Sequence, residues 1–231
     1  MIRHTQSAAI LVGGQATRFG GRDKSGLLVD GRTILDRQIA ELAPLTADLL
    51  IVGGRDVARP SRGRVRVAEP PPPGDGGPPK HREGGSLAPQ MTEPRVVHDI
   101  VPGCGPLGGL HAALTEAQGD ALFVVACDMP YVTSRFIAHL LSLAGDADIV
   151  LPQSARGYHP LCAVYTRACL EPAAARLADR RLKMLEFVAG MRTRVVPVED
   201  IRRFGDPDRL LTNVNTPAEY AGLDALQGHK L

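Results

Sequence analysis

Short apolar runs alternate with amphipathic stretches along this chain, and the alternation predicts an α/β fold. Ala8 to Val12 and Ala121 to Ala126 are apolar at every position and have no polar face. Runs of this kind are typical of strands in a parallel sheet that is covered on both sides. The runs at Leu49 to Val52 and Ile149 to Leu151 predict further strands.

A helix is expected between the strands at Ala8 to Val12 and Leu49 to Val52. Thr33 begins it, and Asp36 stands three residues later, as in a capping box. The strand–helix–strand order predicts a βαβ unit, and therefore parallel pairing with a right-handed crossover. Apolar residues recur at helical spacing, at Ile34, Leu35, Ile39 and Leu42.

The remaining pattern continues the alternation of strands and helices to the C-terminal third of the chain. Helices are predicted at Leu107 to Ala117, Ser134 to Ala144, Ala168 to Ala178 and Leu182 to Ala189. Further strands are predicted at Arg95 to Asp99, Tyr158 to Tyr165 and Thr193 to Val198, and a turn is predicted at Asp30 and Gly31.

One segment breaks the pattern. Nine of the 19 prolines lie between Asp56 and Arg95, where only five side chains are large and apolar. Ordering that backbone would cost roughly 40–80 kcal/mol, at ~1–2 per residue, whereas burying the five side chains would return about 8–15 kcal/mol. We therefore expect a single domain over 1–231 that carries a mobile surface insertion at about 70–94, whose cations are solvated.

Composition excludes several classes of protein. The 231 residues are 44% hydrophobic, enough for one large domain, and a net charge of +2 with 4% aromatic residues argues against a nucleic-acid partner. The four cysteines form no Cys-x2-Cys pair, so we expect reduced core thiols in a cytoplasmic protein. The apolar run that follows the polar stretch Met1 to Ser7 is too short for a signal peptide or a membrane span.

The first strand leads into a loop rich in glycine and basic residues, with the sequence LVGGQATRFGGRDK over 11–24. Glycines let backbone N–H groups approach phosphate oxygens, and cations such as Arg18 and Lys24 balance their charge. The loop has neither the P-loop spacing nor the dinucleotide-binding fingerprint. It therefore predicts a phosphate site of another kind, with an ordinary strand-to-helix turn as the alternative.

Carboxylates follow two other predicted strands. Asp99 ends one, and Asp128 follows the strand at Ala121 to Ala126. Ligands of open α/β sheets bind at the carboxyl ends of the strands, and a carboxylate opposite a phosphate loop is well placed to hold Mg²⁺. The structural alternatives are that Asp99 caps a turn and that Asp128 is the N-cap of the helix after Thr133.

The sequence resembles the nucleotidyltransferases, and among them the molybdenum cofactor guanylyltransferases, at four places. The loop at 11–24 is similar to their first motif, LAGG-x3-R-[MF]-G-G-x-D-K, and the others are D-x5-GPL-[AG]-G from Asp99, CDMP at 127–130 and NVNTP at 213–217. The last favours guanylyl over cytidylyl enzymes. The four lie in order and span most of the chain outside the insertion, to which the resemblance does not extend.

The resemblance implies roles for the residues at matching positions. Arg18, Lys24 and Asp128 would serve catalysis, with Asp128 as the metal ligand. The acceptor would meet His159, Asn213 and Asn215, although the histidine and the asparagines equally suit purely structural roles. The nucleotide would be held by Leu11, Val12, Gly13, Gly14, Lys24, Gly53, Asp99 and Asp128, although Gly53 stands near a position where the family commonly has Asn.

The implied fold is a three-layer, Rossmann-like α/β sandwich with a mostly parallel sheet. The implied reaction transfers GMP from Mg²⁺-bound GTP to the phosphate of molybdenum-bound molybdopterin and releases pyrophosphate. Other proteins of molybdenum cofactor biosynthesis are implied as partners. The alternatives are a cytidylyltransferase on the same cofactor, a sugar-phosphate nucleotidyltransferase and a nucleotide-binding accessory protein.

Overall fold

The computed structural model describes residues 6–13, 27–53 and 93–214. Most of the predicted insertion at about 70–94 lies outside these residues, and Glu93 and Pro94 form irregular chain before the next strand. No helix in the described ranges is long and apolar enough to cross a membrane.

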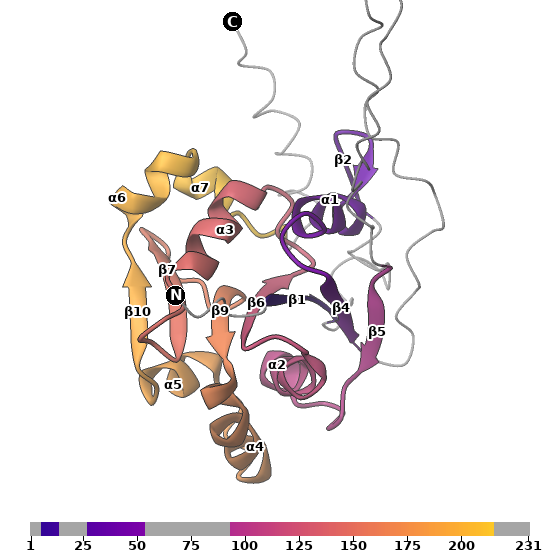
Figure 1. The fold of residues 1–231 in the computed structure, drawn as a ribbon, viewed down its shortest axis with the longest axis vertical. Coiled ribbons are helices and arrows are strands. Elements are labelled where there is room, and N and C mark those ends of the chain that lie inside the picture. Colours follow the sequence, from indigo (N-terminus) through magenta and orange to yellow (C-terminus); the bar gives the residue numbers. More distant parts are fainter. Residues whose placement is uncertain (1–5, 14–26, 54–92, 215–231) are drawn as a thin grey trace, which may run out of the picture.

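A central sheet organises the described residues, in the strand order β10-β7-β9-β6-β1-β4-β5, with β8 paired to β7 (Figure 1). Neighbours along this order pair in parallel except at β9, which is antiparallel to both β6 and β7. The prediction of a mostly parallel sheet is therefore confirmed. The strands are β1 (Gln6–Val12), β4 (Asp48–Gly53), β5 (Arg95–His98), β6 (Ala121–Ala126), β7 (Ile149–Ser154), β8 (Gly157–Tyr158), β9 (Cys162–Thr166) and β10 (Thr193–Val196).

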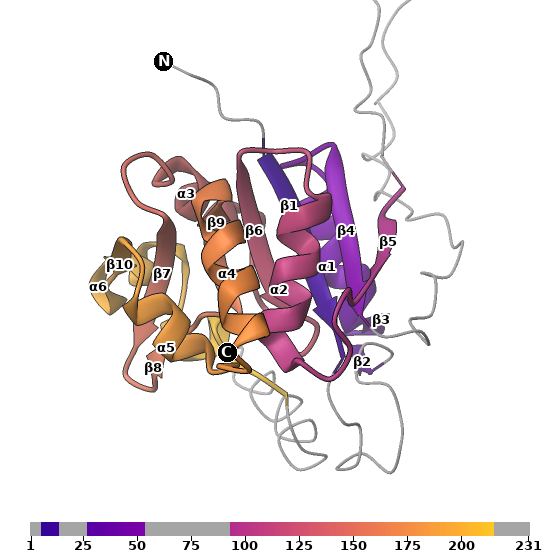
Figure 2. The same cartoon turned by 90° about the horizontal axis from the view of Figure 1, so that it is seen from below.

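Helices cover both faces of the sheet and make the predicted three layers. One face is covered by α1, α3, α6 and α7, and the other by α2, α4 and α5 (Figures 1 and 2). Short 3₁₀ segments at Arg167–Cys169 and Arg202–Phe204 precede α4 and follow α6. The helices are α1 (Ile34–Leu42), α2 (Gly105–Glu116), α3 (Ser134–Ser142), α4 (Leu170–Ala178), α5 (Met184–Ala189), α6 (Val198–Ile201) and α7 (Pro207–Leu210).

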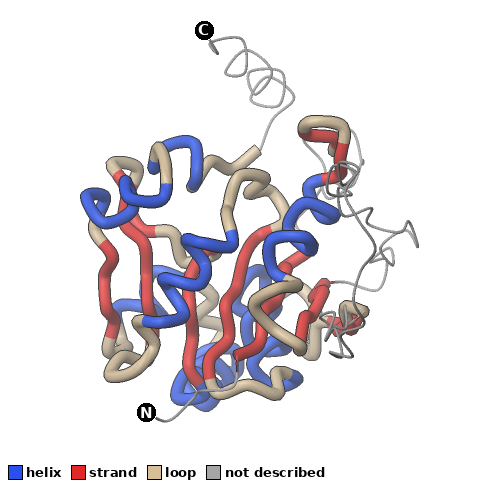
Figure 3. Tube along the Cα trace, turned by 45° about the horizontal axis from the view of Figure 1, so that its top comes forward, coloured by secondary structure: helices blue, strands red, loops and turns tan. Residues whose placement is uncertain are grey.

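The two helical layers, drawn in blue on both sides of the red strands in Figure 3, explain why the central strands have no polar face. In β1, Ile10 faces the core under α1 and α3, whereas Leu11 faces the core under α2. The same alternation places Phe123 and Val124 of β6 in opposite cores. Each strand buries both sets of side chains, as the continuous apolar runs predicted.

The four cysteines are divided between the two cores. Cys127 and Cys162 lie under α1 and α3, and Cys104 and Cys169 lie under α2 and α4. All four are buried and reduced. Burial raises the pKa of the Cys169 thiol to about 12 and raises the pKa of Cys162 as well. The thiols of Cys162 and Cys169 are therefore protonated at neutral pH.

Helix α1 begins as the sequence predicts. The Thr33 hydroxyl accepts a hydrogen bond from the Asp36 N–H at 3.0 Å. A short hairpin precedes the helix and consists of β2 (Leu28–Val29) and β3 (Arg32–Thr33). Its two turn residues, Asp30 and Gly31, have φ angles of 52° and 74°. Two consecutive positive φ angles are typical of the tight turn that joins antiparallel strands.

Proline divides one predicted strand and ends another earlier than expected. The run at Tyr158 to Tyr165 divides into β8 and β9. Pro160 has no N–H to donate to a ladder, and the Cys162 N–H closes a turn on the His159 carbonyl at 3.0 Å. The strand predicted to reach Val198 ends at Val196, where Pro197 becomes the N-cap of α6.

The amino edge of the sheet is held by arginine–carboxylate pairs. Asp48, at the start of β4, accepts from Ser7 at 2.5 Å, from the Gln118 N–H at 2.8 Å and from Arg95 at 2.8 Å. Burial would raise the pKa of the Asp48 carboxyl, but these donors outweigh it and lower the pKa. Asp148, just before β7, is held by Arg192 at 2.7 Å, which lowers its pKa in the same way.

Candidate functional site

The opposite, carboxyl edge of the sheet gathers the residues that the sequence singled out. Strands β1, β4, β5 and β6 are parallel neighbours, so they end on one side of the molecule, at the lower edge in Figure 2. Gly13 follows β1, Gly53 ends β4, Asp99 follows β5 and Asp128 follows β6 by one residue. Gly14, Arg18, Lys24 and Asn215 lie outside the described residues.

The end of β1 offers backbone rather than side chains to a ligand. Leu11 and Val12 are 9% and 5% exposed, and each packs into one of the two cores. The Leu11 carbonyl accepts a hydrogen bond from the Cys127 N–H at 3.1 Å, which ties β1 to the turn that carries Asp128. A ligand at this strand end would therefore meet the chain from Gly13 onward.

Asp99 lies beside the end of β4. Its N–H donates to the Gly53 carbonyl at 3.1 Å. Within the described ranges its carboxylate accepts no hydrogen bond, and the N-cap of α2 is Cys104 instead, so the turn-capping alternative is not observed. Burial raises the pKa of the Asp99 carboxyl against the opposing effect of the neighbouring His98. This partly buried carboxylate suits a hydrogen-bond donor supplied by a ligand.

Two glycines let α2 approach this edge. A Cβ on Gly109 would lie 3.4 Å from the Leu11 side chain and 3.8 Å from the Asp99 carboxylate. A Cβ on Gly108 would lie only 2.9 Å from the Cys104 Cβ. The glycine pair of the GPLGG segment therefore has a packing reason as well as a place beside Asp99.

Asp128 sits in the turn between β6 and α3. Asn213 donates from its side-chain nitrogen to the Asp128 carboxylate at 3.4 Å, and the Val214 N–H donates to the Asp128 carbonyl at 2.8 Å. The N-cap of α3 is Thr133, so the alternative of Asp128 as a helix cap is wrong. Two residues that are 85 positions apart in sequence, from the third and fourth of the motifs named above, are thereby brought together.

His159 reaches the same edge because β9 runs opposite to its neighbours and begins where they end. Its ring nitrogen Nε2 lies 2.8 Å from the Ser154 hydroxyl oxygen, and this oxygen accepts a hydrogen bond from the Arg156 N–H. Burial and the nearby Arg156 lower the pKa of the His159 imidazole, against a smaller effect of Asp208. The contacts of His159 thus lie at the β7–β8 hairpin.

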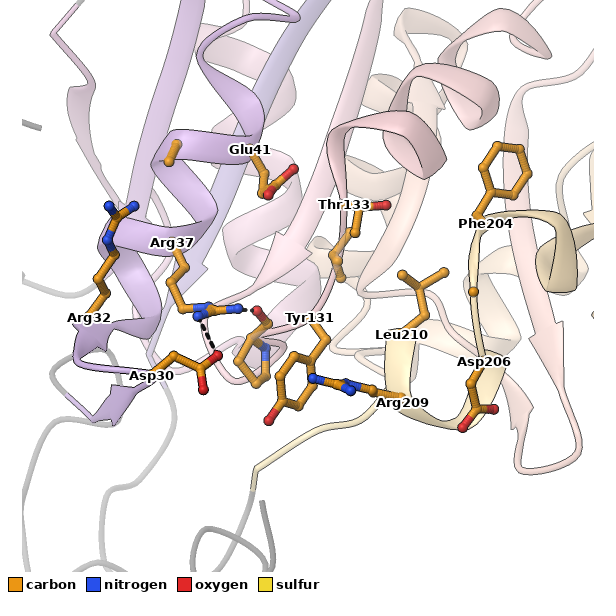
Figure 4. Close-up of a pocket in the computed structure, with 14 residues that line it drawn as sticks. Asp30, Arg32, Arg37, Glu41, Tyr131, Thr133, Phe204, Asp206, Arg209 and Leu210 are labelled. Carbon is orange, nitrogen blue, oxygen red and sulfur yellow. Dashed lines mark hydrogen bonds and ion pairs between the residues drawn. The ribbon is translucent and has the colours of Figure 1, made fainter. Parts of the chain in front are cut away.

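A groove of about 580 Å³ runs beside the Asp128 turn, between α1 and α7 (Figure 4). The ring of Tyr131 lies there beneath the Arg209 guanidinium, 4.7 Å from its carbon, and Arg37 pairs with Asp30 at 2.8 Å. Three arginines and three acidic residues line the groove, so no single charge dominates it: Arg32, Arg37, Arg209, Asp30, Glu41 and Asp206.

Known proteins resemble this chain over most of its length. A family model described as the MobA-like NTP transferase domain matches residues 8–190. The chain belongs to this family. A probable molybdenum cofactor guanylyltransferase of Pelotomaculum thermopropionicum is 28% identical over 92% of this chain and 89% of its own. Another, from Methanosarcina acetivorans, is 31% identical over 92% of this chain and 87% of its own.

The fold of this MobA-like domain is shared with solved structures. A crystal structure described as molybdopterin-guanine dinucleotide biosynthesis protein A from Archaeoglobus fulgidus aligns with a TM-score of 0.70 at 20% identity, over 97% of this chain and 99% of that one. The resemblance inferred from four short motifs is confirmed at the level of the family, and the protein is an enzyme of the nucleotidyltransferase class.

One buried residue beside the candidate site was not predicted from the sequence. Gln38 of α1 is 3% exposed, and its side-chain nitrogen donates to the carbonyls of Ala126 at 2.8 Å and Met129 at 3.1 Å. The signal was present, because a glutamine interrupts the apolar face that Ile34 and Leu42 define on this helix. A polar residue on a buried face needs a partner, but the sequence does not show where that partner lies.

Proposed function

We propose that this enzyme transfers GMP from GTP to the phosphate of molybdenum-bound molybdopterin and releases pyrophosphate. The observation that carries the proposal is the carboxyl edge of the sheet, where the turn of Asp128 is bonded to β1 and to Asn213. The relatives named as guanylyltransferases cover almost the whole chain. Membership of the family is established, and the particular nucleotide and acceptor belong to the proposal.

The chemistry of the donor set fits Mg²⁺. Within the described residues no group of three or more His, Cys, Asp or Glu side chains could hold a metal ion alone. Mg²⁺ is commonly held by one or two carboxylates together with substrate phosphates, which suits Asp128 with the amide of Asn213 beside it. Bound there with the nucleotide, the ion would neutralise charge on the phosphates and polarise the reacting phosphorus.

The nucleotide would be bound by backbone and by Asp99. Since the side chains of Leu11 and Val12 are buried, the chain from Leu11 to Gly14 would contact guanine and ribose through its peptide groups. Asp99 would accept from a donor of the nucleotide, such as the guanine 2-amino group. Gly53 lies next to Asp99 and would contribute only its backbone.

The acceptor would attack from the side of the later strands. Its phosphate is already an anion, so the reaction needs positioning and charge neutralisation rather than a strong general base. Arg18 would supply a cation to the outer phosphates, and Lys24 would supply one to the reacting phosphate. His159, Asn213 and Asn215 would contact the acceptor, His159 as a neutral imidazole because its pKa is lowered.

Pyrophosphate release tests the proposal directly. The purified enzyme, Mg²⁺ and molybdenum-bound molybdopterin should release pyrophosphate with GTP at a much higher kcat/KM than with CTP or ATP. A preference for CTP would make it a cytidylyltransferase, and turnover with a sugar phosphate as the better acceptor would overturn the assigned substrate. Nucleotide binding without any release would instead favour the accessory protein. The same proposal places the enzyme in the cytoplasm with other proteins of this biosynthesis.

A further inference from the structure

The turn that carries Asp128 is fixed by hydrogen bonds from three directions. From β1, Leu11 accepts from the Cys127 N–H. From the C-terminal side, the Val214 N–H donates to the Asp128 carbonyl. The third direction is α1, whose side chains donate hydrogen bonds to backbone carbonyls on both sides of Asp128.

Helix α1 reaches the turn through two consecutive side chains. Gln38 bridges the carbonyls of Ala126 and Met129 with one amide nitrogen, at 2.8 and 3.1 Å. Arg37 donates to the Pro130 carbonyl at 3.2 Å. These bonds join residues 88 to 93 positions apart, so they hold the turn against a rigid helix rather than against its own local chain.

The bridge by Gln38 is buried, which makes it strong and hard to replace. The residue is 3% exposed, so water cannot substitute for either hydrogen bond. Within the described residues its side-chain oxygen has no partner. Burying an unpaired acceptor oxygen destabilises the fold. The two hydrogen bonds that Gln38 donates to the turn offset this destabilisation.

We propose that Gln38 is a positioning residue that sets the direction of the Asp128 carboxylate, and thereby the affinity of the enzyme for its divalent metal. The inference rests on the proposed function, in which Asp128 is the metal ligand. Residues that orient a metal ligand typically change metal affinity or activity by about 10- to 100-fold when they are replaced. Gln38 does not touch substrate, and it acts through the turn.

Gln38→Met tests the inference, because it keeps the volume and removes both donors. We expect the Mg²⁺ concentration for half-maximal turnover to rise by about 10-fold or more, while kcat at saturating Mg²⁺ changes little. Binding of Mn²⁺ to the enzyme with a non-hydrolysable GTP analogue, followed by the electron paramagnetic resonance signal of free Mn²⁺, should weaken to a similar extent. Gln38→Glu keeps the shape but offers at most one donor, and it carries the same expectation if the methionine variant does not fold.

Ser7→Ala is the matched control. It removes another fully buried polar side chain, at the opposite edge of the sheet, where Ser7 donates to Asp48. It should lower the melting temperature without changing metal affinity. Wild-type Mn²⁺ binding by the folded Gln38 variants, or an equal loss in Ser7→Ala, would overturn the inference.

Asp128→Asn separates this inference from the proposed function. If Asp128→Asn weakens Mn²⁺ binding and the Gln38 variants do not, only the positioning role of Gln38 fails. If Asp128→Asn binds Mn²⁺ as the wild type does, Asp128 is not the metal ligand and the role of Gln38 fails with it, whereas the proposed GMP transfer is decided by pyrophosphate release.

Discussion

At the residue scale, carboxylates at the two edges of the sheet have opposite surroundings. Asp48 and Asp148 at the amino edge are held by arginines, which lowers their pKa values. Asp99 at the carboxyl edge is partly buried, accepts no hydrogen bond within the described residues, and has a raised pKa. The first arrangement stabilises the fold, whereas the second suits a ligand that brings its own donor.

Asp128 and Lys24 should both be needed for turnover. Asp128→Ala removes the carboxylate that would hold the metal, and Lys24→Ala removes a cation from the reacting phosphates. Each should lower kcat by on the order of 10²–10³, which corresponds to about 2.7–4 kcal/mol. Pyrophosphate release with GTP and acceptor measures the loss, and a melting curve serves as the control. Wild-type turnover would refute the role, and a collapsed melting curve for Asp128→Ala would indicate a structural one.

GTP binding should weaken in acid because Asp99 becomes protonated; this weakening is the acid limit of binding. Its pKa is raised, so the carboxylate is protonated, and a charged acceptor is lost, at a higher pH than for an ordinary carboxyl near 4. GTP affinity should fall as the pH drops through this raised pKa. Asp99→Asn should weaken binding at neutral pH by at least about 10-fold and remove the limit, and its remaining pH dependence reports the titration of GTP itself. Identical pH profiles for the two proteins, measured by calorimetry, would contradict this role.

At the scale of elements, the glycine pair of α2 offers a test of close packing. Both glycines should gain about 1 kcal/mol in helix propensity when they are replaced by alanine. A Cβ at Gly109 meets ordinary contacts, but one at Gly108 would lie 2.9 Å from Cys104. Gly108→Ala should therefore be less stable than Gly109→Ala by about 1–3 kcal/mol. Urea denaturation of the two variants checks this, and equal midpoints would show that the loop before α2 yields easily.

An element could be predicted only where its sequence carries a local pattern. The buried strands and α1 were predictable because burial on both faces and a helix cap both leave local patterns. The hairpin β2–β3 and helices α6 and α7 are short, so their apolar residues do not repeat often enough to reveal a period. The break at His159 arises from Pro160 and a tertiary turn, which an apolar run does not show.

The candidate site was likewise predictable where local patterns mark a residue, and not where distant segments come together. Asp99 and Asp128 could be placed at the carboxyl edge because the strands that they follow are visible in the sequence, whereas His159 was singled out by the family resemblance. The pairing of Asn213 with Asp128, and the reach of Gln38 into the turn, join distant segments and required the fold. The roles of all the candidate residues remain predictions, and Gly14, Arg18, Lys24 and Asn215 lie outside the described residues.

At the scale of the whole molecule, the amino edge predicts how stability depends on pH. Since the pKa values of Asp48 and Asp148 are lowered by folding, their stabilisation is complete above about pH 4 and is lost as the pH falls through the lowered values. Asp48→Asn should cost about 1–3 kcal/mol at pH 7 and nearly nothing once the wild-type carboxyl is protonated. Denaturation curves at pH 7 and in acid measure the difference, and a constant penalty at both would refute the linkage.

The division of the cysteines between the two cores has a practical consequence. Each thiol can react with a labelling reagent only when the helical layer over it opens. The rate of cysteine modification therefore measures how often that layer opens. Modification of Cys127 and Cys162 reports opening of the layer that contains α1 and α3. Modification of Cys104 and Cys169 reports opening of the layer that contains α2 and α4. Mass spectrometry of partly labelled protein would thus tell whether the sandwich opens one side at a time or both together.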